Sequence, residues 1–506
     1  MPNRTDWLVA LPVLIPALAA AFGAALHGRP RAQRLLTLFS AALLLAAALL
    51  LLAAVADGTV LASQMGDWPA PFGITLVADR LAAAMVLITA IMYAATAVYA
   101  FADRGAMAEE ALWHPLLAAL VFGVASAFLA GDLFNLYVWF EVMLISSFGL
   151  LVLGGGREQL DAALTYGLLN LVATTVFLIA VGMLYGLTGT LNLADMALRV
   201  PGVPNQGAVA AVAFLLMAAF AAKAAVFPLF FWLPASYHTA IAPVAAIFAA
   251  LLTKVGVYAL IRLFTLVFPA SQGWVGPLMW FIAAGTMLVG VLGAAAHWEV
   301  RRILSFHIIS QIGYMIVGLA IATPLAIAGS VFYILHHIIV KANLFLIAGA
   351  MQRIGGSFSL ARLGGLWRRD PWLGLLFAVP ALSLAGLPPL SGFWAKLLVV
   401  QSGFAASYWW LAGIALATGL LTLYSMLKIW LEAFWKEPPE DAPEAAPLSR
   451  RERLLLFGPV VSLGLITLAI GLWAEPLAAF ALAAGEQLST RQEYIRAVLG
   501  GGGTTP

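Results

Sequence analysis

The 506-residue sequence contains no cysteine, and only 10% of its residues are charged. The absence of cysteine excludes disulfide bridges, thiolate catalysis and cysteine-ligated zinc or iron–sulfur clusters. A soluble domain carries about 25% charged residues, so the low charge argues against a large soluble protein. The net charge of +3 comes from arginines scattered over short loops, which does not indicate a nucleic-acid-binding face.

Motifs for nucleotide binding or nucleophilic catalysis are also missing. The glycines at 154–156 lie between two apolar runs with no strand before them, and no GxxxxGK[ST] motif occurs. We therefore expect no cofactor, no metal and no enzyme activity, with the driving force supplied by ion gradients or partner subunits. An enzyme acting on lipid would need an exposed acidic or nucleophilic site at a membrane face, and the sequence offers none.

Long apolar runs are abundant, and most are near 20 residues, enough to cross about 30 Å of hydrocarbon as a helix. Lipid favours helices here because each helix satisfies its own backbone hydrogen bonds. The sequence therefore predicts an all-α integral membrane protein with about fourteen transmembrane helices, at 8–26, 35–55, 77–101, 112–130, 133–153, 162–187, 207–233, 240–266, 277–296, 303–321, 324–350, 372–401, 408–434 and 454–474.

Basic loop residues predict the orientation of these helices. The loops on the side of Arg29 hold fifteen lysines and arginines, and the opposite side, where Arg262 is counted, holds six. Basic residues favour the cytoplasm, so both termini are expected outside, in a bacterial inner membrane. The polar segment 436–453 is then a cytoplasmic loop, and the glycine-rich tail 500–506 is expected to be disordered.

Helix-breaking residues interrupt three predicted spans. Pro228 interrupts the run after Lys223, Pro243 lies at the start of the next span, and Pro388 and Pro389 stand shortly before Lys396. One such proline is most simply a kink. Two breaks that each lie near a lysine indicate function, because unwound backbone at membrane depth needs protein or water to satisfy it.

Lysine is rare and unevenly placed. Of six lysines, five lie inside apolar spans: Lys223, Lys254, Lys341, Lys396 and Lys428. A charge at the bilayer centre costs about 2.5–3.5 kcal/mol on insertion scales. A buried lysine can release its proton, whereas arginine stays charged. Lys428 is close enough to a helix end to snorkel. The other four predict a proton path.

Glu141 is the acid that lies deep in a span, nine residues after Asp132. It is the natural partner for a buried lysine, and Lys223 is the expected one. In a low dielectric, protonating either side chain changes their attraction strongly. A static pair that only joins two helices is the alternative interpretation.

Histidines provide the remaining candidates. His336, His337 and Lys341 share one span, and His337 and Lys341 lie four apart on one helical face. A relay is favoured because imidazole exchanges protons near neutral pH; helix packing or metal binding is the alternative. His238, in a loop, is a possible proton entrance or a capping residue. We expect structural or interfacial roles for His27, His114, His297 and His307.

In this order, Glu141, Lys223 with FPLFFWLP, HTAIAPVAAIFAALLTKVGVY at 238–258, HHIIVKANLFL at 336–346 and AGLPPLSGFWAK at 385–396 resemble a known family. It comprises the antiporter-like, proton-translocating membrane subunits of respiratory complex I, membrane-bound hydrogenases and Mrp-type Na+/H+ antiporters. The resemblance covers about residues 70–435.

The resemblance implies two five-helix repeats of inverted topology, at 112–266 and 277–434. They would follow three N-terminal helices in 1–111 and precede a cytoplasmic loop at 435–453, with a final helix and tail at 454–506. It also implies roles: Glu141 and Lys223 gate one half-channel, Lys254 is the central relay, His336, His337 and Lys341 continue the axis, and Lys396 ends it.

The segment GDLFNLYVWFEVMLISSFGLL is most similar to the D-type subunit of Mrp-type antiporters. Complex I relatives usually carry a proline and a histidine where this sequence has Ala225 and Phe230. The resemblance thus implies membership of a multisubunit Na+/H+ antiporter, with other Mrp-type subunits as partners and protons and sodium as the ions moved. The alternative is a proton-pumping subunit of a complex I-like or hydrogenase redox complex. No cluster of buried carboxylates predicts a sodium site in this chain.

Overall fold

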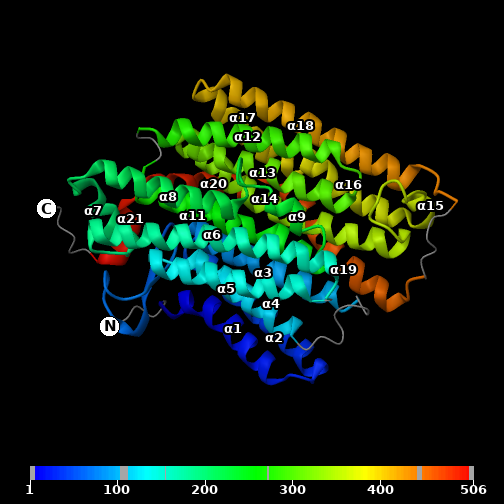
Figure 1. Ribbon diagram of the computed structural model, residues 1–506, viewed down its shortest axis with the longest axis horizontal. Helices are drawn as coiled ribbons and strands as arrows, with labels where there is room; N and C mark the ends of the chain where they lie inside the picture. Colours follow the sequence, from blue (N-terminus) through cyan, green and yellow to red (C-terminus); the bar gives the residue numbers. More distant parts are fainter. Residues whose placement is uncertain (1–5, 103–111, 154, 270–272, 441–446, 501–506) are drawn as a thin grey trace.

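The apolar runs form long helices that lie side by side along one direction of the bundle (Figure 1). Residues 6–102, 112–153, 155–269, 273–440 and 447–500 of the computed structural model are described here. Within them, twelve helices are long and apolar enough to cross a membrane, and α4 and α16 are shorter apolar helices. The prediction of an all-α membrane protein with about fourteen spans is confirmed.

The N-terminal part comprises three helices and a small hairpin. Its elements are α1 (Asp6–Ala25), α2 (Pro30–Ala54), β1 (Leu61–Gln64), η1 (Met65–Asp67), β2 (Thr75–Ala78) and α3 (Arg80–Ala100). The two strands are antiparallel, with Leu61 paired with Ala78 and Gln64 with Thr75. Asp79 caps α3 by accepting a hydrogen bond from the Ala82 N–H, which satisfies one free donor of the first turn.

Two groups of helices follow. The first comprises α4 (Trp113–Leu129), α5 (Leu133–Val152), α6 (Arg157–Thr188), α7 (Leu193–Arg199), η2 (Val200–Gly202), α8 (Gln206–Ala224), α9 (Trp232–Ser236), α10 (Ala242–Ile247), the π-helical η3 (Phe248–Leu252) and α11 (Thr253–Leu266). The second comprises α12 (Val275–Ala296), α13 (Val300–Ile321), α14 (Pro324–Gly355), α15 (Leu366–Arg369), α16 (Pro371–Ala385), α17 (Ser391–Ala405), α18 (Trp409–Ile429) and the π-helical η4 (Trp430–Trp435).

The two longest helices carry matching residues. Both α6 and α14 have 32 residues, and a tyrosine lies nine positions after the first residue of each, Tyr166 and Tyr333. Four and eight positions further on, α14 has His337 and Lys341, and α6 has Asn170 and Thr174. At these matching positions α14 therefore carries a titratable pair and α6 carries neutral polar side chains.

Both predicted helix breaks are present. The first helix ends where Ala225 adopts a left-handed conformation (φ 57°), just after Lys223. The second ends at Gly386 (φ 93°), and α17 begins at Ser391 after the two prolines. The freed carbonyls at both breaks lie inside the bundle, where side chains can reach them.

The C-terminal part is more helical than the sequence predicted. It comprises α19 (Arg450–Leu472), α20 (Ala474–Ser489) and α21 (Gln492–Leu499). Gly471, near the end of α19, packs on the second helix break, since a Cβ there would lie 2.5 Å from the Pro389 carbonyl oxygen. The last predicted span, 454–474, corresponds to α19, and two further helices, α20 and α21, follow it. Of the tail predicted to be disordered, 501–506 lies outside the described residues.

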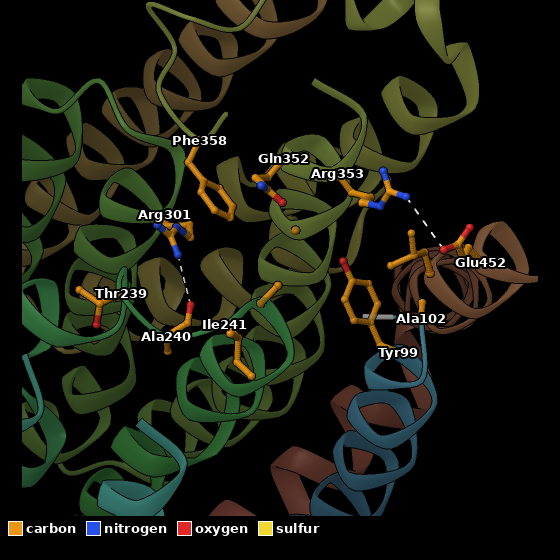
Figure 2. A pocket seen from close by; sticks show the side chains of 13 residues that line it. Tyr99, Ala102, Thr239, Ala240, Ile241, Arg301, Gln352, Arg353, Phe358 and Glu452 are labelled. Atoms are coloured by element: carbon orange, nitrogen blue, oxygen red, sulfur yellow. Dashed lines mark hydrogen bonds and ion pairs between the residues drawn. The ribbon is translucent and has the colours of Figure 1, made fainter. Parts of the chain in front are cut away.

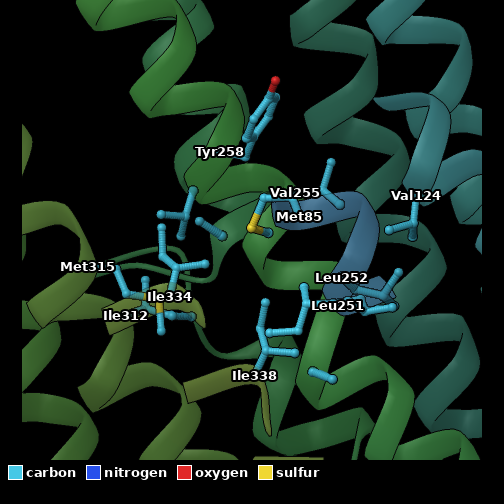
Figure 3. Packing of buried hydrophobic residues seen from close by; sticks show 14 of the residues in the cluster. Met85, Val124, Leu251, Leu252, Val255, Tyr258, Ile312, Met315, Ile334 and Ile338 are labelled. Carbon is cyan, nitrogen blue, oxygen red and sulfur yellow. The ribbon is translucent and has the colours of Figure 1, made fainter. Parts of the chain in front are cut away.

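The start of α1 and the helix α21 lie at one end of the bundle, called here the terminal end (Figure 1). The opposite end holds α15 and is called the Lys436 end, because the Lys436 carbonyl oxygen accepts from the Gly365 N–H just before α15. Between them, α3, α4, α11, α13 and α14 meet in an apolar core. Figure 3 shows Met85, Val124, Val255, Met315 and Ile334, one from each of these five helices, within this core. The core surrounds the polar side chains described next and isolates them from lipid.

Candidate functional site

Predicted relay side chains come from five helices and are largely buried at the middle of the bundle. Lys223 is 9% exposed, and Lys254, His337 and Lys341 are fully buried. His336 is 1% exposed, and Glu141 and Lys396 are partly buried. Their helices are α5 for Glu141, α8 for Lys223, α11 for Lys254, α14 for the His336, His337 and Lys341 cluster, and α17 for Lys396.

Glu141 and Lys223 are neighbours without direct contact. The structure places no ion pair within 4 Å between them in the described part of the chain, but the two groups interact electrostatically. The Nζ atom of Lys223 lies 5.5 Å from the centre of the Phe140 ring, beside Glu141. No salt bridge therefore holds either side chain to the other in the described structure.

Lys254 lies on α11, which packs against α8 beside Lys223. Its Nζ donates to the Ala249 carbonyl oxygen, which belongs to the π-helical segment η3. Two residues along, Gly256 packs directly on the backbone of α8: a Cβ there would lie 2.6 Å from the Ala224 nitrogen and 3.0 Å from the Lys223 carbonyl carbon. The absence of a side chain at 256 is what brings α8 and α11 together at the two lysines.

His337 and Lys341 have buried polar atoms with no hydrogen-bond partner among the described residues. These atoms are both ring nitrogens of His337 and the Nζ of Lys341. Lys341 interacts electrostatically with Lys254, and His337 interacts with both lysines. A buried donor without a partner costs about 1–3 kcal/mol, so this group is retained against a penalty that an apolar residue would avoid.

A chain of serines links His336 to the second helix break. The Nδ1 of His336 lies 2.8 Å from the Ser391 hydroxyl, which lies 2.9 Å from the Ser383 hydroxyl. Beyond it, Lys396 Nζ donates to the carbonyl oxygens of Leu384 (3.0 Å) and Ala385 (2.7 Å), both freed by the break. Sequence reasoning missed the two serines, because serine is common and only the fold brings them to the histidine.

His307 is not at an interface, one of the two roles predicted for it. It is fully buried and interacts electrostatically with Lys341, Lys396 and Lys428. It starts a polar row on α13: Ser310 lies 3.5 Å from its Nδ1, and the next residue, Gln311, accepts from the Tyr333 hydroxyl. Three histidines on two helices, His307 on α13 and His336 and His337 on α14, therefore interact with the lysine series.

Lys428 does not snorkel to the surface. It is 7% exposed, and its Nζ donates to the carbonyl oxygens of Ala295 and His297, each at 2.7 Å. These carbonyls end α12, where a cation is favoured by the helix dipole. The position is explained by helix capping.

A cavity of about 440 Å³ opens at the Lys436 end beside the start of α10 (Figure 2). Figure 2 shows Arg301 donating to the Ala240 carbonyl oxygen on one side of it and Arg353 paired with Glu452 on the other. His238, the predicted entrance, precedes the lining residues 239–242 and accepts from Arg302 at 3.1 Å. Burial, followed by Arg302 and Arg301, lowers the pKa of His238 to about 4. The imidazole is therefore neutral at pH 7.

Known proteins resemble the chain over nearly its whole length. The family model for the transmembrane part of NADH:quinone oxidoreductases and Mrp antiporters matches residues 130–422. The D-type subunit of the Na+/H+ antiporter of Alkalihalophilus pseudofirmus is 43% identical and that of Bacillus subtilis 38% identical, each over 97% of this chain and 99% of the relative. The chain belongs to this family, within its D-type group.

Solved structures agree with the family assignment. A chain in the Mrp complex of a Dietzia species superposes with a TM-score of 0.92 at 34% identity, covering 98% of this chain and 100% of the other. A chain of the archaeal membrane-bound sulfane sulfur reductase gives 0.89 at 25% identity, covering 97% and 99%. A chain of respiratory complex I from Thermus thermophilus gives 0.79 at 27%, covering 96% and 100%.

The family match brackets the relay candidates of this Mrp-type chain. Glu141 lies near its beginning and Lys396 near its end, and Lys428 with α19, α20 and α21 lies beyond it. In the described residues, no group of three or more histidines, aspartates and glutamates could hold a metal ion. The matched region therefore contains every predicted relay residue.

Proposed function

We propose that this chain is the proton-translocating subunit of a multisubunit Na+/H+ antiporter. Protons would move along the line of Glu141, Lys223, Lys254, the His336, His337 and Lys341 cluster, and Lys396. The observation that carries the proposal is this series of titratable side chains, which runs through the apolar centre of the bundle from α5 to α17. Such residues are expensive at membrane depth and typically mark ion pathways.

Internal water would complete the path. Glu141 Oε1, both His337 nitrogens, Lys341 Nζ and the Thr253 and Thr418 hydroxyls are buried without a hydrogen-bond partner in the described chain. Buried polar groups of this kind normally bind ordered water, which makes about three hydrogen bonds. Water beside Lys254 and Lys341 would join lysines that do not touch each other.

Protons would enter from the cytoplasm through the cavity beside 239–242. The start of α1 and the helix α21 share the opposite end of the bundle, and we propose that this end faces outward, as the basic loops indicate. His238 would lie beside the entrance, next to the lining residue Thr239, as a neutral hydrogen-bond acceptor. At Lys396, the two carbonyl oxygens of the second break would hold the last ammonium of the series.

Sodium would cross elsewhere in the assembly. The described chain has no acidic cluster that could replace the hydration shell of Na+. We propose that other Mrp-type subunits, or an interface with them, provide this route, since the Dietzia relative was solved within an Mrp complex. A charge crossing 100 mV carries about 2.3 kcal/mol, so inward proton flow can drive sodium exit.

The test uses inverted membrane vesicles that contain the chain with all of its co-purifying subunits. Sodium should collapse a preformed pH gradient in wild type and should have no effect with Lys223→Ala at equal assembly. Glu141→Ala should also abolish exchange, whereas Glu141→Asp should retain part of it. The control is Lys428→Ala, which should have the smallest effect of the five lysine changes. Normal exchange by assembled Lys223→Ala would refute the relay.

The alternative is a proton-pumping subunit of a redox complex. The likeness to the chains of sulfane sulfur reductase and complex I favours it. In this case sodium would have no effect, and oxidation of NADH or hydrogen would build a gradient that Lys223→Ala loses. The identity of the co-purifying subunits separates the two functions directly.

A further inference from the structure

An ion pair that the proposed relay does not use lies buried at the terminal end. Arg262 of α11 donates from Nη1 to Asp79 Oδ2 at 2.6 Å and from Nη2 to Asp79 Oδ1 at 2.9 Å. Asp79 is 2% exposed and Arg262 5%. Burial raises the pKa of Asp79, but Arg262 and the Ala82 N–H lower it more, with a net decrease. The pair is thus a fixed carboxylate and a fixed guanidinium.

This pair stands at the end of a polar row that begins at Lys254. Lys254, Tyr258 and Arg262 are spaced four apart on α11, so they share one helical face. The hydroxyl of Tyr258 donates to the Phe128 carbonyl oxygen at 2.6 Å and accepts from Arg262 Nη2 at 3.1 Å. The row leads away from the relay toward the surface of the terminal end, through residues that are otherwise apolar and buried.

The C-terminal helix covers the guanidinium. The ring of Tyr494, in α21, has its centre 5.2 Å from Arg262 Cζ, and the Tyr258 ring has its centre at 5.3 Å. Gln64 Nε2 donates to the Val498 carbonyl oxygen at 3.4 Å, and Arg491 donates to that of Leu266 at 3.3 Å. These contacts hold α21 against the hairpin and the end of α11.

We propose that Arg262, fixed by Asp79 and covered by Tyr494, is a cationic barrier that closes a side exit from Lys254 to the terminal surface. Guanidinium does not release its proton under ordinary conditions, so it cannot pass a proton on as a lysine can. The pair with Asp79 has no net charge, but its guanidinium end contacts the Tyr258 hydroxyl, so a hydronium or sodium ion in the row would meet the positive end of the pair. The barrier would direct protons from Lys254 to Lys341 instead of letting them escape. The inference rests on the proposed relay through Lys254.

A purely structural pair would join α3 to α11 without affecting ion flow. The two roles differ in passive proton leak, measured without sodium in vesicles containing the full complex, under an imposed potassium diffusion potential. The double variant Asp79→Asn with Arg262→Gln removes both charges and leaves no lone buried ion. The barrier predicts a leak about tenfold above wild type, equivalent to about 1.4 kcal/mol, at equal complex yield. A structural role predicts no leak in the assembled complex.

The matched control is Asp370→Asn with Arg453→Gln. Asp370 is also a buried helix cap paired with an arginine (2.9 Å), but it lies at the Lys436 end. This variant should not leak. Tyr494→Leu keeps both charges and removes the cover, so it should also leak, while Tyr494→Phe should not, because the Tyr494 hydroxyl has no partner among the described residues.

If the charge-neutral double variant and Tyr494→Leu both leak no faster than wild type, the barrier is refuted. If the double variant is not recovered, the Tyr494→Leu result decides alone. Sodium-linked exchange in wild type is measured in the same vesicles. Its absence would count against the proposed antiport, whereas normal exchange without leak in the variants would refute only the barrier.

Discussion

Gly256→Ala should separate the helices that carry Lys223 and Lys254. The added Cβ would lie 2.6 Å from the Ala224 nitrogen, and ordinary contact begins at 3.4 Å, so α8 and α11 must move apart by about 0.8 Å. Both partners are backbone atoms, which cannot rotate away. Overpacking of this kind costs about 1–3 kcal/mol, partly offset by the about 0.5–1 kcal/mol that alanine gains over glycine in a helix.

The effect on transport should exceed the effect on stability. A displacement of about 1 Å can reduce the rate of a geometrically demanding step about 100-fold, so we expect sodium-linked proton exchange to fall at least about tenfold. Thermal unfolding of the purified complex should shift down by only a few degrees. Both are measured per assembled complex in the same preparation.

Gly413→Ala provides the matched control. Gly413 lies within α18, and a Cβ there would meet nothing within 4 Å. Stability should stay the same or rise slightly, and exchange should remain normal. Full exchange and an unchanged melting temperature with Gly256→Ala would refute the reasoning, since they would mean that the contact between α8 and α11 adapts without moving the lysines.

Three further predictions test other parts of the site. Ser391→Ala should abolish exchange without loss of assembly, because Ser391 bridges His336 and Ser383. Ser402→Ala, in the same helix, should be normal, since its hydroxyl donates to the Val399 carbonyl within its own helix, and equal exchange by the two variants would contradict the serine link. Lys428→Met should lower the free energy of unfolding by about 2 kcal/mol, because two capping bonds are lost, and should therefore lower the melting temperature, while each assembled complex still transports. A loss of transport greater than the loss of complex would place Lys428 on the path. His238→Gln should leave the pH profile of exchange between pH 6 and 9 unchanged. A histidine with its pKa lowered to about 4 stays neutral over that range, and glutamine can still accept from Arg302; a shifted midpoint would show that His238 titrates during transport.

Much of the fold could be predicted because the membrane leaves few choices. Apolar runs near 20 residues, prolines inside two of them and lysines beside the breaks were enough to place the spans and the broken helices. The C-terminal helices were missed for a local reason. Trp473 interrupts the last span, and α21 is too short and too polar to resemble one.

Pairings between distant residues could not be predicted. Asp79 and Arg262 are 183 positions apart, and each lies near the end of an apolar run, where a charge is ordinary. The surroundings of His307 and of the Ser391 hydroxyl likewise could not be predicted, because they depend on neighbours on α13, α14 and α16. A charged side chain near the end of a span can be exposed to solvent or paired with another residue. The order of residues along the chain does not distinguish these two environments.

The sequence by itself determined that titratable side chains stand at membrane depth, because hydrocarbon length and the cost of burying charge act on each span separately. The tertiary structure decided which of these side chains face one another. It brought Gly256 against α8 beside Lys223, joined His336 to the second helix break through two serines, and closed the end of α11 with an arginine. Such contacts depend on how helices pack, and close packing is a property of the assembled bundle.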